Sequence, residues 1–141
     1  MQTISGNLAQ LQSMFSGIDD ELDRYSLLIE LSSLLPGADG LRDEENLYRG
    51  CQSQVWLRAE APDGLCRLVG DSDTVLIRGV LFLFAALIEN VPVADVLEAD
   101  CDLLDALSLG SLFSSQRTLG ISGLLPEIRR QLTAQGGGAH A

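Results

Sequence analysis

The sequence predicts an α+β fold in which a small antiparallel sheet packs against several helices. Apolar residues recur with the helical period over residues 8–35. From residue 55 the period changes to the alternation of a β-strand, and a Pro-Asp-Gly turn at 62–64 leads to a second apolar run. Residues 80–88 are apolar on nearly every side, which indicates a helix buried at the centre of the fold.

The N-terminal third is predicted to form two helices. Apolar spacing places a short first helix at residues 6–16. Carboxylates at 19–21 favour the start of a second helix because they face the positive end of its dipole. We expect Pro36-Gly37 to end that helix. A polar segment, 38–48, then leads to the first strand.

The middle of the chain is predicted to form a hairpin followed by the central helix. Residues 55–61 alternate as a strand, and residues 65–69 return as its partner. Asp71 and Ser72 have the side chains of an N-cap, which predicts a long helix over residues 73–89.

The C-terminal part is predicted to be helical in three places. Pro92 fits the first turn of a short helix that ends at Leu97. A second short helix is expected at 101–107. A loop, 108–120, then precedes a terminal helix at 121–132.

The length of 141 residues fits one compact domain with a hydrophobic core. We expect that domain over residues 1–135 and a flexible glycine-rich tail at 136–141. The apolar run 80–88 is too short to span a bilayer, and the N-terminus lacks the basic and apolar regions of a signal peptide. The expected location is therefore cytoplasmic.

The charge of the chain bears on its partners. The net charge is −11, and nine acidic residues lie between 19 and 45 against only Arg24 and Arg42. Because binding to phosphates needs a cationic surface, this balance disfavours nucleic acid and anionic membranes. It fits attraction towards a basic protein surface, or simply a solvated acidic face.

The three cysteines, at 51, 66 and 101, limit the chemistry. Their odd number and wide spacing predict no disulfide framework. The only histidine, His140, is in the tail, so neither a metal site nor a Cys-His hydrolase is expected. Cys66 is assigned to the core, and Cys101 lies among carboxylates that disfavour a thiolate.

Cys51 is the candidate functional residue. A single thiol without a general base can still take sulfur onto its own sulfur atom and release it again. Gly50 allows close approach of other groups, and Arg49 is a source of positive charge that would favour the thiolate. From the residues alone, a small buried hydrophobe remains the alternative.

Three motifs in colinear order make the chain resemble the SufE family of sulfur acceptors over residues 25–132. They are GCQSQVWL at 50–57, VGDSDTVLIRGVLFLFAAL at 69–87 and SSQRTLGISGLLPEIR at 114–129. The resemblance implies an α+β fold similar to that of the IscU scaffold, with Cys51 as the acceptor thiol.

The resemblance also implies partners. The chain is expected to bind a pyridoxal-phosphate-dependent cysteine desulfurase of the SufS type, to stimulate it, and to relay its persulfide sulfur to the SufBCD scaffold for iron–sulfur cluster assembly. Pyridoxal phosphate belongs to the partner, so we expect no cofactor, no metal and no independent turnover in this chain. The segment 52–54, Gln-Ser-Gln, fits the SufE branch better than its paralogue CsdE. A monomer and a homodimer both remain open.

The resemblance further implies that the acceptor loop rests against the body and moves out on docking. The loop 48–53 is predicted to switch between these states. Gly50, Trp56 and Arg117 are expected to support it, and Gln52 and Ser53 to hold it through side-chain hydrogen bonds to the backbone.

Several polar and aromatic residues have two possible roles each. Arg49, Asp71 and Asp73 are candidates for contact with the partner, although both aspartates would equally suit a helix cap. Trp56 is expected to close the packing around the loop, with partner contact second. Without the resemblance, Arg117 would be an ordinary loop or helix-terminal arginine. The competing functions are a non-covalent activator of the desulfurase and a cluster scaffold. The scaffold is disfavoured because the cysteines lack ligand spacing.

Overall fold

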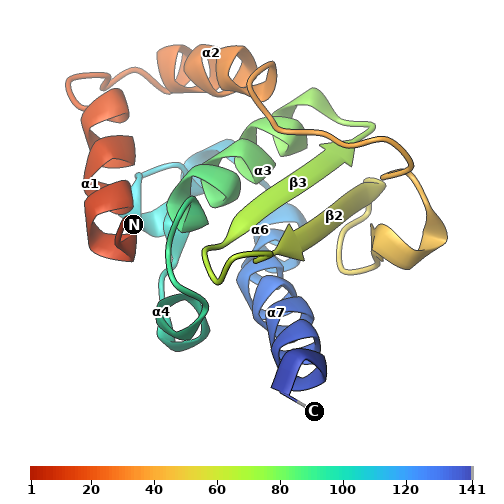
Figure 1. Ribbon diagram of the computed structural model, residues 1–141. Coiled ribbons are helices and arrows are strands. Elements are labelled where there is room, and N and C mark those ends of the chain that lie inside the picture. Colours follow the sequence, from red (N-terminus) through yellow and green to blue (C-terminus); the bar gives the residue numbers. More distant parts are fainter. Residues whose placement is uncertain (141) are drawn as a thin grey trace.

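The computed structural model describes the backbone of residues 1–140 and the side chains of residues 1–135. The fold is α+β, as predicted, with a three-stranded sheet and helices before and after it (Figure 1). The elements, in chain order, are α1 Ile4–Phe15, α2 Glu21–Ser32, the 3₁₀ turn η1 Glu44–Asn46, β1 Leu47–Tyr48, β2 Val55–Glu60, β3 Arg67–Ser72, α3 Val75–Ile88, α4 Val93–Glu98, α5 Leu103–Ala106, the 3₁₀ turn η2 Gly110–Leu112, α6 Ser115–Ser122 and α7 Leu124–His140.

The predicted flexible tail, 136–141, falls on residues whose side chains, and in one case whose backbone, lie outside the described part. It therefore stays a prediction. Over the backbone that is described, no helix has the length and apolarity that a membrane crossing requires.

The sheet is antiparallel in the order β1-β2-β3. The predicted hairpin is confirmed, but its second strand starts two residues later and ends three residues later than the interval 65–69. The ladder continues until Val55 pairs with Ser72, so Asp71 and Ser72 are strand residues. The predicted N-cap at these two positions is wrong. The N-cap of α3 is Thr74, which makes no side-chain capping hydrogen bond.

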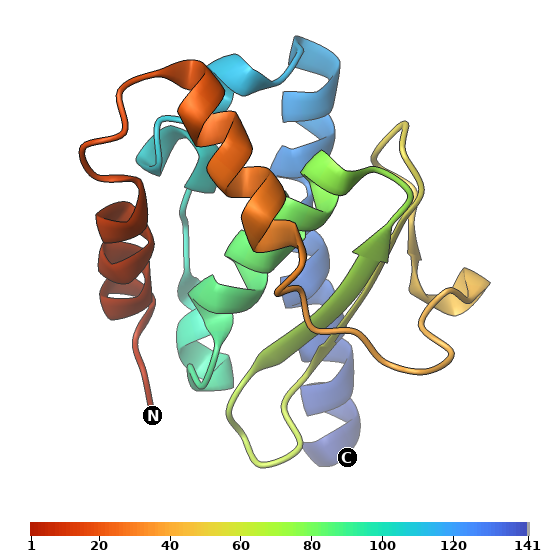
Figure 2. The same ribbon diagram turned by 90° about the horizontal axis from the view of Figure 1, so that it is seen from above.

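Helix α3 is the centre of the molecule, as its apolar sequence predicts. Nine of its fourteen residues are buried, and α1, α2 and β3 all pack against it. Figure 2 shows α2 crossing over α3, while α7 lies against β2. The crossing is close because α3 has Gly79 at the contact. A Cβ at Gly79 would lie 2.5 Å from the carbonyl oxygen of Leu28.

The other face of the sheet carries a second, smaller cluster. Trp56 packs with Leu41 and Val69, and the guanidinium of Arg42 lies 4.5 Å above the indole ring. The segment between α2 and β1 supplies Leu41 and Arg42, so it covers this face of the sheet (Figure 2). Trp56 is 8% exposed, which agrees with a packing role rather than an open contact surface.

The C-terminal region differs from the prediction. Residues 115–120, expected as loop, belong to α6, which also takes in the first two residues of the predicted helix 121–132. The rest of that predicted helix, from Leu124, is the beginning of the longer α7. Helix α6 starts where Ser114 accepts a hydrogen bond from the backbone N–H of Arg117 at 3.2 Å. Gly123 then separates α6 from α7 as the C-cap residue. The apolar periodicity alone did not reveal this serine cap.

Substitution of Gly79 by alanine should destabilise the protein. Its Cβ would meet the backbone of Leu28, which cannot move aside as a flexible side chain can. We expect a loss of about 1–3 kcal/mol in the free energy of unfolding, measured by urea denaturation. Gly37→Ala is the matched control because no atom lies within 4 Å of its added Cβ. Equal stability of the two variants would contradict the close crossing of α2 and α3.

Candidate functional site

Cys51 lies in the connection between β1 and β2, half-buried and packed against the edge of the main hydrophobic core. Helix α6 approaches it through Gly120. A Cβ at Gly120 would lie 2.8 Å from the Sγ atom of Cys51 and 2.8 Å from the carbonyl oxygen of Gly50. Because no side chain fits there, Gly120 allows α6 to lie directly on the loop that carries the thiol.

The electrostatics of Cys51 combine two opposing effects. Burial raises the pKa of the thiol, while the positive charge of Arg117 on α6 lowers it, and the balance is a raised pKa. Arg49, expected to favour the thiolate, forms an exposed ion pair with Glu44 at 3.0 Å instead. The cation that lowers the pKa of Cys51 is therefore Arg117, which the sequence predicted only as a support of the loop, and not Arg49.

Gln52 and Ser53, the two residues that follow Cys51, hold the loop in place. The side-chain amide of Gln52 donates to Oε1 of Gln116 on α6 at 2.9 Å. Ser53 accepts a hydrogen bond from the hydroxyl of Thr74 at 2.8 Å. Both interactions join side chains, so the expectation of bonds to the backbone is wrong for these two residues. The loop is thus tied to α6 on one side and to the start of α3 on the other.

The end of the loop is fixed at Gln54. Its backbone N–H donates to Oδ1 of Asp73 at 3.1 Å, and its carbonyl oxygen accepts from the hydroxyl of Ser72 at 2.7 Å. The backbone N–H of Asp73 donates to the same carbonyl at 3.3 Å. Asp73 therefore supports the loop that carries Cys51 and not the N-terminus of α3.

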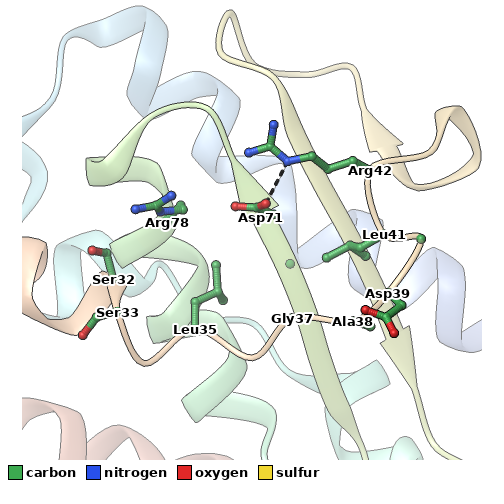
Figure 3. Close-up of a pocket in the computed structure, with 12 residues that line it drawn as sticks. Ser32, Ser33, Leu35, Gly37, Ala38, Asp39, Leu41, Arg42, Asp71 and Arg78 are labelled. Carbon is green, nitrogen blue, oxygen red and sulfur yellow. Dashed lines mark hydrogen bonds and ion pairs between the residues drawn. The ribbon is translucent and has the colours of Figure 1, made fainter.

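Asp71 lies elsewhere, on the face of the sheet that carries Trp56. It pairs with Arg42 at 2.8 Å and lines a groove of about 620 Å³ with Arg78, as Figure 3 shows. Burial works against the ionised form, but hydrogen bonds from Arg42 and from the N–H of Ser72 hold the pKa of Asp71 below its ordinary value. None of the described hydrogen bonds joins Asp71 to the loop 48–53. Its role in partner contact stays a prediction.

Tyr48 is the site residue to which sequence reasoning gave no role. Its hydroxyl donates a hydrogen bond to the carbonyl oxygen of Gly120 at 2.8 Å. Gly50 passes so close to the phenol that a Cβ there would lie 2.1 Å from the hydroxyl oxygen. Close approach is therefore the reason for glycine at 50, since its φ is not positive. The signal in the sequence that could have pointed to this contact was the aromatic Tyr48 two positions before Gly50.

At the other two cysteines no positive charge lowers the pKa of the thiol. Cys66 is 1% exposed, and burial raises its pKa to about 11. Cys101 is half-buried, and burial together with Asp102 and Asp100 raises the pKa of its thiol. Both observations agree with the predicted core and inert assignments. In the part of the chain that is described, no three histidine, cysteine or acidic side chains gather as a metal site.

The alkylation of Cys51 should follow its raised pKa. Because the thiolate is the reactive form, the rate with iodoacetamide should still be rising at a pH where an exposed thiol has levelled off. Arg117→Gln should move this profile to higher pH because it removes the charge that lowers the pKa. Arg49→Gln should leave the profile in place. The measurement is peptide mass mapping over a pH series, and an unchanged profile in Arg117→Gln would contradict the assignment.

The family model SufE, Fe-S metabolism associated domain, matches residues 9–132. An uncharacterized SufE-like protein of Rhizobium etli is 31% identical over 131 residues, which cover 89% of this chain and 88% of that protein. Another, of Rhizobium meliloti, is 30% identical over 131 residues, with 89% and 94% covered.

The fold also has a counterpart among solved structures. The solution structure of a hypothetical protein from Thermus thermophilus matches with a TM-score of 0.75 and 21% identity, over 91% of this chain and 94% of that one. At this identity the likeness concerns the fold. The family match over most of the chain, together with the two relatives, leads to one conclusion: the protein belongs to the SufE family, whose domain is associated with Fe–S metabolism.

Proposed function

We propose that this protein is a sulfur acceptor for a pyridoxal-phosphate-dependent cysteine desulfurase, with Cys51 as the residue that carries the sulfur. The observation that supports this most is the contrast among the three thiols. Cys51 alone combines partial exposure, a neighbouring cation and a loop held mainly by side-chain contacts. Family membership gives the chemical context, which is Fe–S metabolism.

The transfer step requires no other co-reactant. The Cys51 thiolate attacks the terminal sulfur of the partner's cysteine persulfide, and a new S–S bond forms on Cys51. The S–S bond in the donor breaks, and the donor cysteine leaves as a thiolate. The sulfane sulfur keeps its oxidation state, and the proton from Cys51 passes to solvent or to the leaving thiolate. Arg117 favours this step because its charge stabilises the attacking thiolate.

The partial burial of Cys51 suits both its resting state, the free thiol, and its loaded state, the persulfide. A raised pKa keeps the empty thiol mostly protonated and unreactive at neutral pH. A persulfide is more readily oxidised or reduced than a thiol, so cover from the core and from α6 protects the cargo. Release then requires that the loop 48–53 moves outward when the desulfurase docks.

The partners are proposed from the sequence of the loop and from family membership. Gln52-Ser53-Gln54 favours a SufS-type desulfurase over the CsdA type, and SufBCD would receive the sulfur for cluster assembly. Arg49 and Asp73 lie at or beside the loop, where such a partner would dock, and both are partner-contact candidates together with Asp71. We expect stimulation of the desulfurase, a cytoplasmic location and no turnover by this chain alone.

Intact mass spectrometry after incubation with a SufS-type desulfurase and cysteine tests the proposal. The wild-type chain should gain the mass of one sulfur atom, and a reductant should remove it. Cys51→Ser should gain none because the nucleophile is missing. Cys101→Ser is the matched control and should load normally, since burial and its acidic neighbours raise the pKa of that thiol.

The other outcomes point to the alternatives. Stimulation of the desulfurase by Cys51→Ser to the wild-type extent, with no sulfur gained by either protein, would favour a non-covalent activator. Iron and colour that purify with the chain would favour a cluster scaffold. Loading of Cys51→Ser at the normal rate would refute the carrier role of Cys51.

A further inference from the structure

Tyr48 connects the thiol loop to α6. It ends β1, in register with Val55 of β2, and only Arg49 and Gly50 separate it from Cys51. Its hydroxyl donates to the carbonyl oxygen of Gly120 at 2.8 Å. Gly120 is also the residue whose Cα faces the Sγ atom of Cys51. The phenol and the thiol therefore contact α6 at the same residue.

The phenol hydroxyl occupies a space that two glycines leave open, Gly50 and Gly123, here called the glycine socket. A Cβ at Gly50 or at Gly123 would lie 2.1 Å from the hydroxyl oxygen of Tyr48. The backbone of Gly123 is ordinary, with φ −85° in the right-handed helical region. Its conformation does not require glycine. The phenol is what excludes a side chain at Gly123.

We propose that Tyr48 is a positioning residue that latches Cys51 in its half-buried state, with the phenol seated in the glycine socket. The functional meaning of the latch rests on the proposed sulfur-acceptor role of Cys51. Because two residues join Tyr48 to Cys51, the thiol cannot swing far outward while the phenol stays seated. Docking of the desulfurase must therefore displace the phenol before the thiol is fully exposed.

The hydroxyl acts through position and not as an acid or base. Its proton is engaged by the carbonyl oxygen of Gly120. Burial, and to a smaller extent Cys51 and Glu127, raise the pKa of Tyr48 above its ordinary value. The phenol is therefore neutral at physiological pH and remains a hydrogen-bond donor.

The test is the alkylation rate of Cys51 in the full chain, measured with iodoacetamide and without any desulfurase. Tyr48→Phe removes only the hydroxyl, and Gly123→Ala fills the socket with one methyl group. The loss of one net hydrogen bond corresponds to about a fivefold increase in the open state. We expect each variant to raise the Cys51 rate by about that factor. Tyr25→Phe changes an exposed tyrosine and should have no effect.

Cys66 and Cys101 are internal reporters in the same samples. Loss of the latch should expose Cys51 alone, so the alkylation rates of Cys66 and Cys101 should stay unchanged. A parallel rise at all three cysteines would mean that Tyr48 only contributes to global stability, and the proposal would be wrong. Wild-type rates at Cys51 in both variants would overturn it equally.

The double variant gives a second, independent check. With phenylalanine at 48, the methyl group of Gly123→Ala no longer meets a hydroxyl, and the nearest ring atom lies at 3.4 Å. The double variant should therefore react at about the rate of Tyr48→Phe, whereas two independent effects would multiply. Multiplied rates would refute the shared socket. Because no sulfur transfer is involved, these results stand or fall separately from the mass measurement on the desulfurase reaction.

Discussion

The structure depends on the burial of α3, a helix that is apolar on nearly every side. Such a helix cannot lie on a surface, because each exposed leucine or isoleucine would forgo about 1.5–3 kcal/mol of transfer free energy. The chain meets this constraint by placing α1, α2 and the sheet around it. Gly79 lets α2 cross closely enough to leave no gap at Leu28. The small sheet then has one face committed to the core and the other covered by the segment after α2.

The thiol site is built at the boundary of this core and not inside it. Its supports come from three separate parts of the chain: Tyr48 on β1, Thr74 ahead of α3, and Gln116 with Gly120 on α6. Each contact is a single hydrogen bond or a close approach, and a typical hydrogen bond contributes about 1 kcal/mol. A loop held by such contacts is well placed in the resting protein, yet a docking partner could release it without disturbing the packed centre.

The sequence predicts those features of the fold that depend on residues close together in the chain, and it misses those that depend on a single cap or on contacts between distant segments. The central helix and the hairpin are visible in the sequence because they rest on local periodicity and on turn residues, and a motif singles out Cys51 as the candidate cysteine. The start of α6 was missed since it is set by one serine cap at Ser114. The two-residue strand β1 was missed because so short a segment carries no alternation. Residues Asp71 and Ser72 were assigned to a cap although the ladder with β2 extends through them.

The surroundings of Cys51 were likewise hard to predict, because they are formed by residues distant in sequence. Arg117 could be placed from its motif, but its action on Cys51 arises only when α6 folds back across some sixty residues of sequence. Arg49, two positions before Cys51, was expected as a source of charge but pairs with Glu44. The glycines at 120 and 123 carried no signal of their own, since Gly120 accommodates the distant Cys51 and Gly123 the phenol of the distant Tyr48.

The three hydrogen bonds at Gln54 make that residue a pivot. The strand downstream of it is locked into the sheet, so any outward swing of the loop must turn about this point. Three peptide units separate the pivot from Cys51, which limits the radius of the arc to about 10 Å of fully extended chain. The sulfur atom of Cys51 thus has a short reach. In the proposed transfer, a donor would have to bring its own sulfur almost to the surface of this protein, and a deeply recessed donor cysteine would need a mobile arm of its own.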